Sequence, residues 1–128
     1  EVFRKCIERQ DGDQRVIDDY SRLPQPAGTV QFATARAGYV TAVDAERVGV
    51  AVRALGGGRS RAEDTIDHAV GVIVRAKPGE YVAEAGTVFE IHDSDPEKLA
   101  EAGRILSGAY TIGDAPPASE PLVLEEIA

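Results

Sequence analysis

The chain holds few residues whose types and spacing could carry chemistry, and its two histidines are the first of them. His68 follows Asp67 and His92 precedes Asp93, so each histidine has a carboxylate neighbour of the kind that orients a general base. Adjacent residues of a strand point to opposite faces, however, and no serine, cysteine or lysine is placed to act as a nucleophile beside them. The pattern therefore favours packed or surface histidines. A metal site formed by both histidines with Asp93 or Asp95 is a weaker alternative, because no HxH or HxxxH spacing supports it.

A second group consists of three consecutive glycines, residues 56–58, followed by Arg59, Ser60 and Arg61. Glycine amides and guanidinium groups are good donors to phosphate oxygens. A phosphate-binding glycine loop precedes a helix, however, whereas these glycines follow a predicted helix, whose C-terminal end repels anions. We therefore expect the glycines to end that helix and to lead into a charged loop that does not bind phosphate within this chain.

Lys77 lies in a predicted β-turn, where a carrier domain presents the lysine that receives biotin or lipoate. Its neighbours Ala76 and Pro78 do not provide the methionine or aspartate context of such lysines. A biotinyl- or lipoyl-like carrier or an interaction module is therefore the alternative function, and an intact mass would distinguish it.

Composition limits the class of protein. The 128 residues correspond to one domain, and 14 basic against 22 acidic residues give a net charge of −8, which disfavours a nucleic-acid partner. The longest uncharged apolar run, residues 69–74, is six residues long, whereas a membrane-spanning helix needs about 20. The one cysteine, Cys6, permits no internal disulfide and is expected to pack as a small apolar residue, so we expect a reducing, cytoplasmic location. Because the chain lacks methionine and opens inside a predicted helix, we expect it to be part of a longer protein.

Hydrophobic periodicity and turn signals predict the elements that must position these residues. Apolar residues at helical spacing predict helices over residues 1–10, 45–55 and 96–107, the last two with Asp44 and Asp95 as N-caps. Runs rich in β-branched and aromatic residues predict strands over residues 29–35, 38–43, 70–74, 81–82, 87–91, 110–112 and 122–127. The three strands between residues 70 and 91 are joined by tight turns and are expected to fold back on one another as hairpins. This order predicts an α+β fold, preceded by a linker over residues 13–28, which are rich in aspartate, proline and glycine.

A set of short segments along the chain forms a more specific pattern. They are Ala37-Gly38-Tyr39-Val40, Asp44, Val48-Gly49, Leu55-Gly56-Gly57-Gly58-Arg59, Arg61-Ala62-Glu63-Asp64, Ile66-Asp67-His68-Ala69-Val70-Gly71, Lys77-Pro78-Gly79-Glu80 and Ile91-His92. In this order they closely resemble the C-terminal region of the pyrimidine nucleoside phosphorylases, the thymidine phosphorylase family. Gln10-Asp11-Gly12-Asp13 is similar to the family's preceding segment, although Asp11 stands where the family more often has a glycine. The resemblance covers nearly the whole chain.

The resemblance implies an α/β-hammerhead fold for residues 29–128, akin to the barrel-sandwich turns of biotinyl and lipoyl carriers and with two packed helices. Residues 1–12 would then be the end of the preceding domain's last helix, and residues 13–28 the linker. The implied reaction of the parent enzyme is reversible phosphorolysis of thymidine- or uridine-type nucleosides to the free base and a pentose 1-phosphate. Phosphate is a co-substrate of that reaction, and no other cofactor is expected.

The resemblance also implies where that chemistry takes place. It assigns the phosphate-binding loop and the base-binding residues to the preceding domains, so this chain is expected to hold no catalytic or metal-binding residue and to be inactive alone. Arg59, Ser60 and Arg61 are the residues expected to face the parent's catalytic cleft. The expected partners are the N-terminal catalytic domains of the same chain and a second parent chain in a homodimer, without nucleic acid or membrane.

Overall fold

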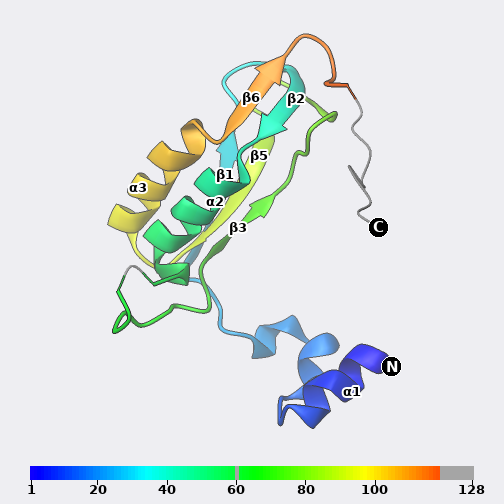
Figure 1. Cartoon of the computed structure of the whole chain (residues 1–128), viewed down its shortest axis with the longest axis vertical. Coiled ribbons are helices and arrows are strands. Elements are labelled where there is room, and N and C mark those ends of the chain that lie inside the picture. The colour runs from blue at the N-terminus through cyan, green and yellow to red at the C-terminus, as the bar shows by residue number, and fades with distance from the viewer. Residues whose placement is uncertain (60, 119–128) are drawn as a thin grey trace, which may run out of the picture.

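The computed structural model describes residues 1–59 and 61–118. Its helical elements are α1 (Val2–Arg9), the 3₁₀ turns η1 (Gln14–Ile17) and η2 (Tyr20–Arg22), α2 (Ala45–Val52), the π-helical turn η3 (Arg53–Gly57) and α3 (Pro96–Ser107). Its strands are β1 (Gly28–Ala33), β2 (Gly38–Val43), β3 (Gly71–Val74), β4 (Tyr81–Val82), β5 (Thr87–Asp93) and β6 (Tyr110–Gly113). The predicted order of elements and the α+β class are confirmed (Figure 1). The closing strand predicted over residues 122–127 lies outside the described residues.

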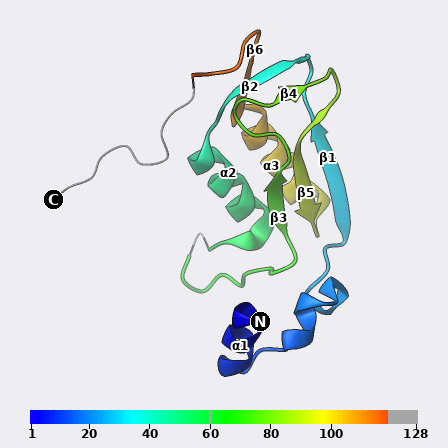
Figure 2. The ribbon, with the colours of Figure 1, turned by 90° about the vertical axis from the view of Figure 1, so that its right-hand side faces the viewer.

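The described strands form two antiparallel sheets, in the orders β1-β5-β3 and β4-β2-β6. In the first sheet Phe32 of β1 lies opposite Phe89 of β5, and Gln31 lies opposite Glu90. Because side chains alternate along a strand, the two phenylalanines share one face and the two polar residues share the other. Helices α2 and α3 pack against each other and cover the face with the phenylalanines, with α2 contacting β3 and α3 contacting β5 (Figures 1 and 2).

Helices α2 and α3 begin at the two predicted N-caps. The Asp44 carboxylate accepts a hydrogen bond from the Arg47 amide at 3.0 Å. The Asp95 carboxylate accepts from the amides of Glu97 at 2.9 Å and Lys98 at 3.2 Å. These contacts satisfy amides that have no partner inside the helix, so each helix starts at a position fixed by local sequence. Among the described residues, no helix has the length and apolar content needed to cross a membrane.

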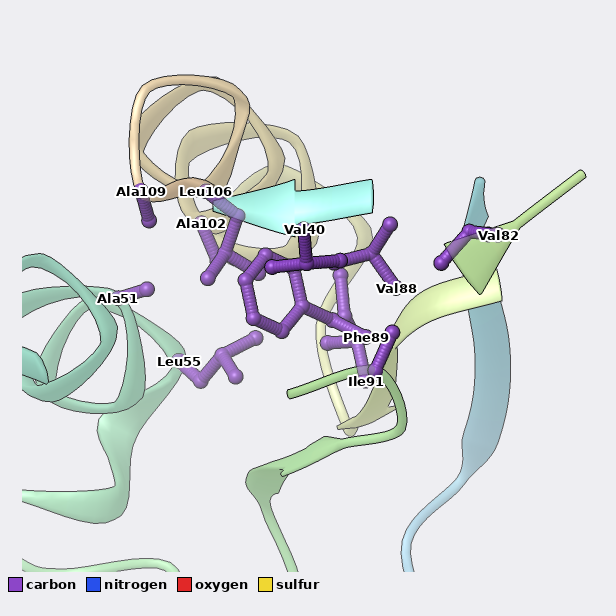
Figure 3. Packing of buried hydrophobic residues seen from close by; sticks show 11 residues of the cluster. Val40, Ala51, Leu55, Val82, Val88, Phe89, Ile91, Ala102, Leu106 and Ala109 are labelled. Atoms are coloured by element: carbon purple, nitrogen blue, oxygen red, sulfur yellow. The ribbon is translucent and has the colours of Figure 1, made fainter. Parts of the chain in front are cut away.

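The core lies between the helix pair and the sheets. Its buried apolar residues are Val40, Ala51, Leu55, Ala76, Val82, Val88, Phe89, Ile91, Ala102, Leu106 and Ala109. Figure 3 shows the ring of Phe89 at the centre of this cluster, surrounded by Leu55 of η3, Leu106 of α3 and Val40 of β2. Residues from all the layers therefore converge on one side chain of β5.

Three aromatic rings join the two sheets. The centroid of Phe89 lies 6.0 Å from that of Phe32 and 5.7 Å from that of Tyr110, and the rings of Phe89 and Tyr110 meet edge to face. Phe32 also meets Tyr110 edge to face, at 6.2 Å. Since Tyr110 belongs to β6 and the phenylalanines belong to β1 and β5, these contacts hold one sheet against the other.

The strands between residues 70 and 91 pair differently from the prediction. The turns lie where the sequence places them, but β3 pairs with β5 and β4 pairs with β2, so these strands do not form sequential hairpins. The Gly79 amide donates to the Val40 carbonyl at 2.8 Å, and the Val40 amide donates to the Glu80 carbonyl at 2.9 Å. Pro78 followed by Gly79 at φ +93° is typical of a type II turn, which splays the strands that it joins. The turn therefore carries the chain from one sheet to the other.

The N-terminal helix forms as predicted, but its cysteine does not pack. Cys6 is exposed, and Val2 and Phe3 on the same apolar stripe are 78% and 69% exposed. In both views α1 lies beyond one end of the sheets, away from the core (Figures 1 and 2). The expectation of a packed Cys6 is therefore wrong, because no described element covers this face. The expected linker contains η1 and η2, and the domain boundary there stays a prediction.

We expect Phe89→Ala to lower the free energy of unfolding by about 3–5 kcal/mol, because the substitution removes a fully buried ring and leaves a cavity. Urea denaturation followed by circular dichroism measures the change. Phe3→Ala makes the same chemical change at an exposed position and should alter the free energy by no more than about 0.5 kcal/mol. Equal effects of the two substitutions would contradict the central role of Phe89.

Candidate functional site

The glycines after α2 end the helix, as predicted, and begin the loop that carries the candidate cleft-facing residues. Gly56 has φ +102°, a conformation that glycine adopts without a side-chain penalty, and its carbonyl accepts the Asp67 amide at 2.9 Å. Leu55, which is 2% exposed, anchors the residue before it in the core. At the other end of the loop the Arg61 amide donates to Asp64 Oδ2 at 2.8 Å. The first end of the loop is therefore held against the fold, and the Arg61–Asp64 bond closes a local turn within the loop.

The loop presents cations but no set of converging donors. Arg59 and Arg61 are exposed, and Ser60 lies outside the described residues. A shallow pocket of about 310 Å³ beside the loop is lined by Arg53, Ala54, Gly56, Gly58, Asp64, Thr65 and Lys98. The pocket brings together charges of both signs at the C-terminal end of α2, whereas a phosphate site gathers amides and cations at a helix N-terminus.

Asp67 stabilises its own loop and does not orient a catalytic His68. Its Oδ1 accepts the Ala69 amide at 2.9 Å. This hydrogen bond, followed by one from the Ser94 side chain and by the nearby charge of Lys98, lowers the pKa of Asp67. His68 itself is exposed. Of the two expected placements, packed or on the surface, His68 therefore has the surface one.

Glu90 is the centre of a polar cluster on the outer face of the first sheet, here called the Glu90 cluster (Gln31, Arg75, Glu90 and His92). Gln31 Nε2 donates to Glu90 Oε2 at 3.0 Å, and Arg75 Nε and Nη2 donate to the same oxygen at 3.1 and 2.7 Å. His92 Nε2 lies 2.9 Å from Glu90 Oε1. Hydrogen bonds from Gln31, His92 and Arg75, in decreasing order of effect, lower the pKa of Glu90 to about 2.

The sequence analysis did not identify this cluster. The alternation of Glu90 and His92 along one strand face was a usable signal, but the partners Gln31 and Arg75 depend on the register of β1 and β3 against β5. Asp93, the sequence neighbour of His92, is 8% exposed, and its Oδ1 has no hydrogen-bond partner in the described part of the chain. Adjacent strand residues point to opposite faces, so Asp93 does not orient His92.

Both histidines line one groove. Its volume is about 770 Å³, and it is lined by Tyr20, Ser21, Leu23, Pro24, Gln25, Pro26, His68, Ala69, Val70, Gly71, Val72, Ile73 and His92. The groove therefore lies between the segment before β1 and the strand β3, which the sequence alone does not bring together. Among the described residues, no group of three histidine, cysteine or acidic side chains is placed to hold a metal ion.

Lys77 is the first residue of a hydrogen-bonded β-turn. Its amide donates to Glu80 Oε2 at 2.8 Å, and its carbonyl accepts the Glu80 amide at 3.0 Å. This turn also bonds to β2 through Gly79 and Glu80, so it serves to connect the two sheets.

The two sheets, the helix pair and the loop after α2 define an α+β domain whose polar clusters lie on its outer faces. The family model described as "Pyrimidine nucleoside phosphorylase C-terminal domain" matches residues 39–113, which run from β2 to β6, and the chain belongs to this family.

Curated relatives agree with this assignment. The pyrimidine-nucleoside phosphorylases of Staphylococcus aureus strains USA300, NCTC 8325 / PS 47 and COL are 37% identical to this chain over 114 residues. The matched region is 89% of this chain and 26% of each relative, so the chain spans about a quarter of the length of the curated relatives that it matches.

We expect Gly56→Ala to lower the free energy of unfolding by about 1–2 kcal/mol, because a side chain disfavours the positive φ. Gly58→Ala is the matched control. Gly58 is extended, with φ −150°, and an added Cβ would meet Arg53 at an ordinary 3.5 Å, so we expect a change of no more than about 0.5 kcal/mol. Urea denaturation of both variants measures these changes. A larger loss of stability in Gly58→Ala than in Gly56→Ala would contradict the role of Gly56 in ending the helix.

The Glu90 cluster predicts a specific loss of stability in acid. The unfolded chain takes up a proton at Glu90 near pH 4.5, whereas the folded chain does so only near pH 2. The stabilisation is therefore complete above about pH 4.5 and is lost as the pH falls to about 2. We expect the Glu90→Gln variant to lose less stability than the wild type over this interval, as measured by urea unfolding at a series of pH values.

Glu84→Gln is the control for this measurement, because Glu84 is exposed and the described residues give it no hydrogen bond or ion pair. It should keep the acid dependence of the wild type. If Glu90→Gln also keeps it, the cluster does not hold the carboxylate in its ionised form.

Proposed function

We propose that this chain is the C-terminal domain of an enzyme that reversibly phosphorolyses pyrimidine nucleosides. The observation that carries the proposal is the family match over residues 39–113, together with relatives that are named pyrimidine-nucleoside phosphorylases and extend well beyond the matched region. In the proposed reaction a phosphate oxygen forms a bond to C1 of the sugar while the bond from C1 to the base nitrogen breaks. The electron pair of that bond leaves with the base, which takes up a proton, and the sugar leaves as a pentose 1-phosphate. Phosphate is the co-substrate, and the proposal includes no other cofactor.

The transition state of this reaction shows why the catalytic groups are proposed to lie in the preceding domains. The sugar becomes cationic while negative charge grows on the departing base, so an enzyme must hold phosphate and donate hydrogen bonds to the base at the same time. The Glu90 cluster is centred on a carboxylate, and the pocket beside the glycine loop contains Asp64 as well as cations. Neither arrangement supplies that set of donors.

The proposed role of this domain is to support the cleft through the loop after α2. Arg59 and Arg61 are exposed on a loop that begins at the buried Leu55 and at Gly56, whose carbonyl accepts the Asp67 amide, and a local bond from the Arg61 amide to Asp64 shapes the loop. We propose that these arginines, with Ser60, face the cleft between this domain and the preceding ones. Such cations would attract phosphate and stabilise the closed arrangement of the domains.

The same proposal covers the enzyme's partners and location. It pairs this domain with the N-terminal catalytic domains of its own chain, takes the parent as a cytoplasmic homodimer, and assigns the choice between thymidine and uridine to residues outside this chain. The biotinyl or lipoyl carrier alternative has no support from the family match or the relatives.

We expect the full-length enzyme to release thymine or uracil from its nucleoside only when phosphate is present, and the 128-residue chain to release none. Ultraviolet absorbance of the liberated base measures the reaction, after a host phosphorylase has been excluded. Turnover by the 128-residue chain would overturn the accessory role, and a full-length protein without phosphate-dependent release would overturn the proposed activity.

The loop is tested separately in the full-length enzyme. We expect Arg59→Ala and Arg61→Ala to lower kcat/KM by about 10-fold or more, because each removes a cation from the cleft. Arg104→Ala is the control, since this exposed arginine pairs with Glu101 on α3. Equal kcat/KM values for the loop variants and the control, with unchanged unfolding temperatures, would contradict the proposal that the loop faces the cleft.

A further inference from the structure

The loop after α2 is joined at its two ends, here called the neck (Gly56 and Asp67). The Gly56 carbonyl accepts the Asp67 amide at 2.9 Å. Beside this bond, a Cβ added to Gly57 would lie 3.4 Å from Cγ2 of Val70, which packs against the core. Residues 57–66 therefore leave the fold and return to it at nearly the same place, as in the Ω-loops that often carry functional residues.

The side chain of Asp67 joins this neck to a third part of the fold. Its Oδ1 accepts the amide of Ala69, just before β3, at 2.9 Å. Its carboxylate also accepts a hydrogen bond from the side chain of Ser94, between β5 and α3, and the charge of Lys98 in the first turn of α3 lies nearby. These contacts lower the pKa of Asp67. One half-buried side chain thus links the end of α2, the start of β3 and the start of α3.

The neighbours of the Asp67 carboxylate are donors and cations. They include an amide, a hydroxyl and an ammonium group, from Ala69, Ser94 and Lys98. A carboxylate accepts hydrogen bonds at both oxygens, whereas asparagine replaces one of these oxygens by an NH2 donor that would face other donors. The neck therefore depends on the charge of Asp67 and not only on its shape.

We propose that Asp67 is a positioning residue of the enzyme, which holds the loop after α2 so that Arg59 and Arg61 lie at the cleft between this domain and the preceding ones. This inference rests on the proposed function, in which these arginines face that cleft. Both arginines lie in the chain between Gly56 and Asp67. The neck joins the loop to the fold and therefore fixes the orientation of the loop relative to the sheets and helices.

The position of a cation determines how much it stabilises a developing charge. Preorganised groups act on a transition state without reorganisation at the moment of reaction, and a displacement of about 1 Å can lower a rate by about 100-fold. Without the carboxylate of Asp67, the loop would sample several orientations. Arg59 and Arg61 would then be in place for only part of the time, and the rate would fall in proportion.

Kinetics of the full-length enzyme test the proposal. We expect Asp67→Asn to lower kcat/KM for phosphorolysis by about 10-fold or more. In an enzyme that also carries Arg59→Ala and Arg61→Ala, the same substitution should lower kcat/KM by less than about 2-fold, because the cations that it positions are absent. Asp44→Asn is the matched control. The Asp44 carboxylate also accepts an amide and lies near an arginine, but at the opposite end of α2, so kcat/KM should not change.

Amide hydrogen exchange of the same full-length samples measures the loop itself. We expect Asp67→Asn to speed the exchange of the Asp67 and Ala69 amides by at least about 10-fold, because the neck opens more often. The β5 amides, which are central in the first sheet, are the reference and should keep their protection. Ser94→Ala removes one donor and leaves the carboxylate. This milder variant should change exchange and kcat/KM in the same direction by smaller factors, and it decides by the same criteria if Asp67→Asn does not fold.

Three results would overturn the positioning role. They are an Asp67→Asn variant with the wild-type kcat/KM, an equal loss of kcat/KM with and without the two arginines, and unchanged exchange of the Asp67 and Ala69 amides. In an active wild-type enzyme each of these results contradicts the positioning role alone. A full-length wild type without phosphate-dependent release of the base contradicts the proposed function and, with it, the role of Asp67 in the reaction.

Discussion

The packing of Phe89 is the contact on which the rest of the α+β fold depends. Its ring is fully buried, meets Phe32 in its own sheet and Tyr110 in the other sheet, and lies among side chains from both helices (Figure 3). Neither three-stranded sheet could hide its apolar face alone, because a small sheet needs a second layer to cover it. Phe89 therefore unites two sheets and two helices in a single core.

The central position of β5 also creates the polar surface of the domain. Because side chains alternate along a strand, Glu90, which follows Phe89 and lies in register with Gln31 and Ile73, faces outward and contacts three polar neighbours. One face of β5 thus contributes to the core, and the other contributes to the Glu90 cluster. The hydrogen bonds of the cluster hold the Glu90 carboxylate in its ionised form.

Burial of side chains distinguishes two parts of the chain. The α+β domain, whose matched family region runs from β2 to β6, has its own buried core. Residues 1–23 have helical structure and ion pairs that join α1, η1 and η2, but no buried residue.

The sequence by itself determined the α+β class, the order and approximate bounds of the described α-helices and strands, both N-caps and the helix end at Gly56. These features depend on local interactions, such as the carboxylate of Asp44 with the amides three residues on, or the freedom of glycine at positive φ. The family resemblance was also contained in the sequence, and the family match confirms it. Only the tertiary structure decided that β3 pairs with β5 and β4 with β2, that Glu90 gathers Gln31, Arg75 and His92, and that Cys6 remains exposed. Strand partners and burial are set by contacts between residues far apart in the chain, and a periodic pattern states which face is apolar without stating what covers it.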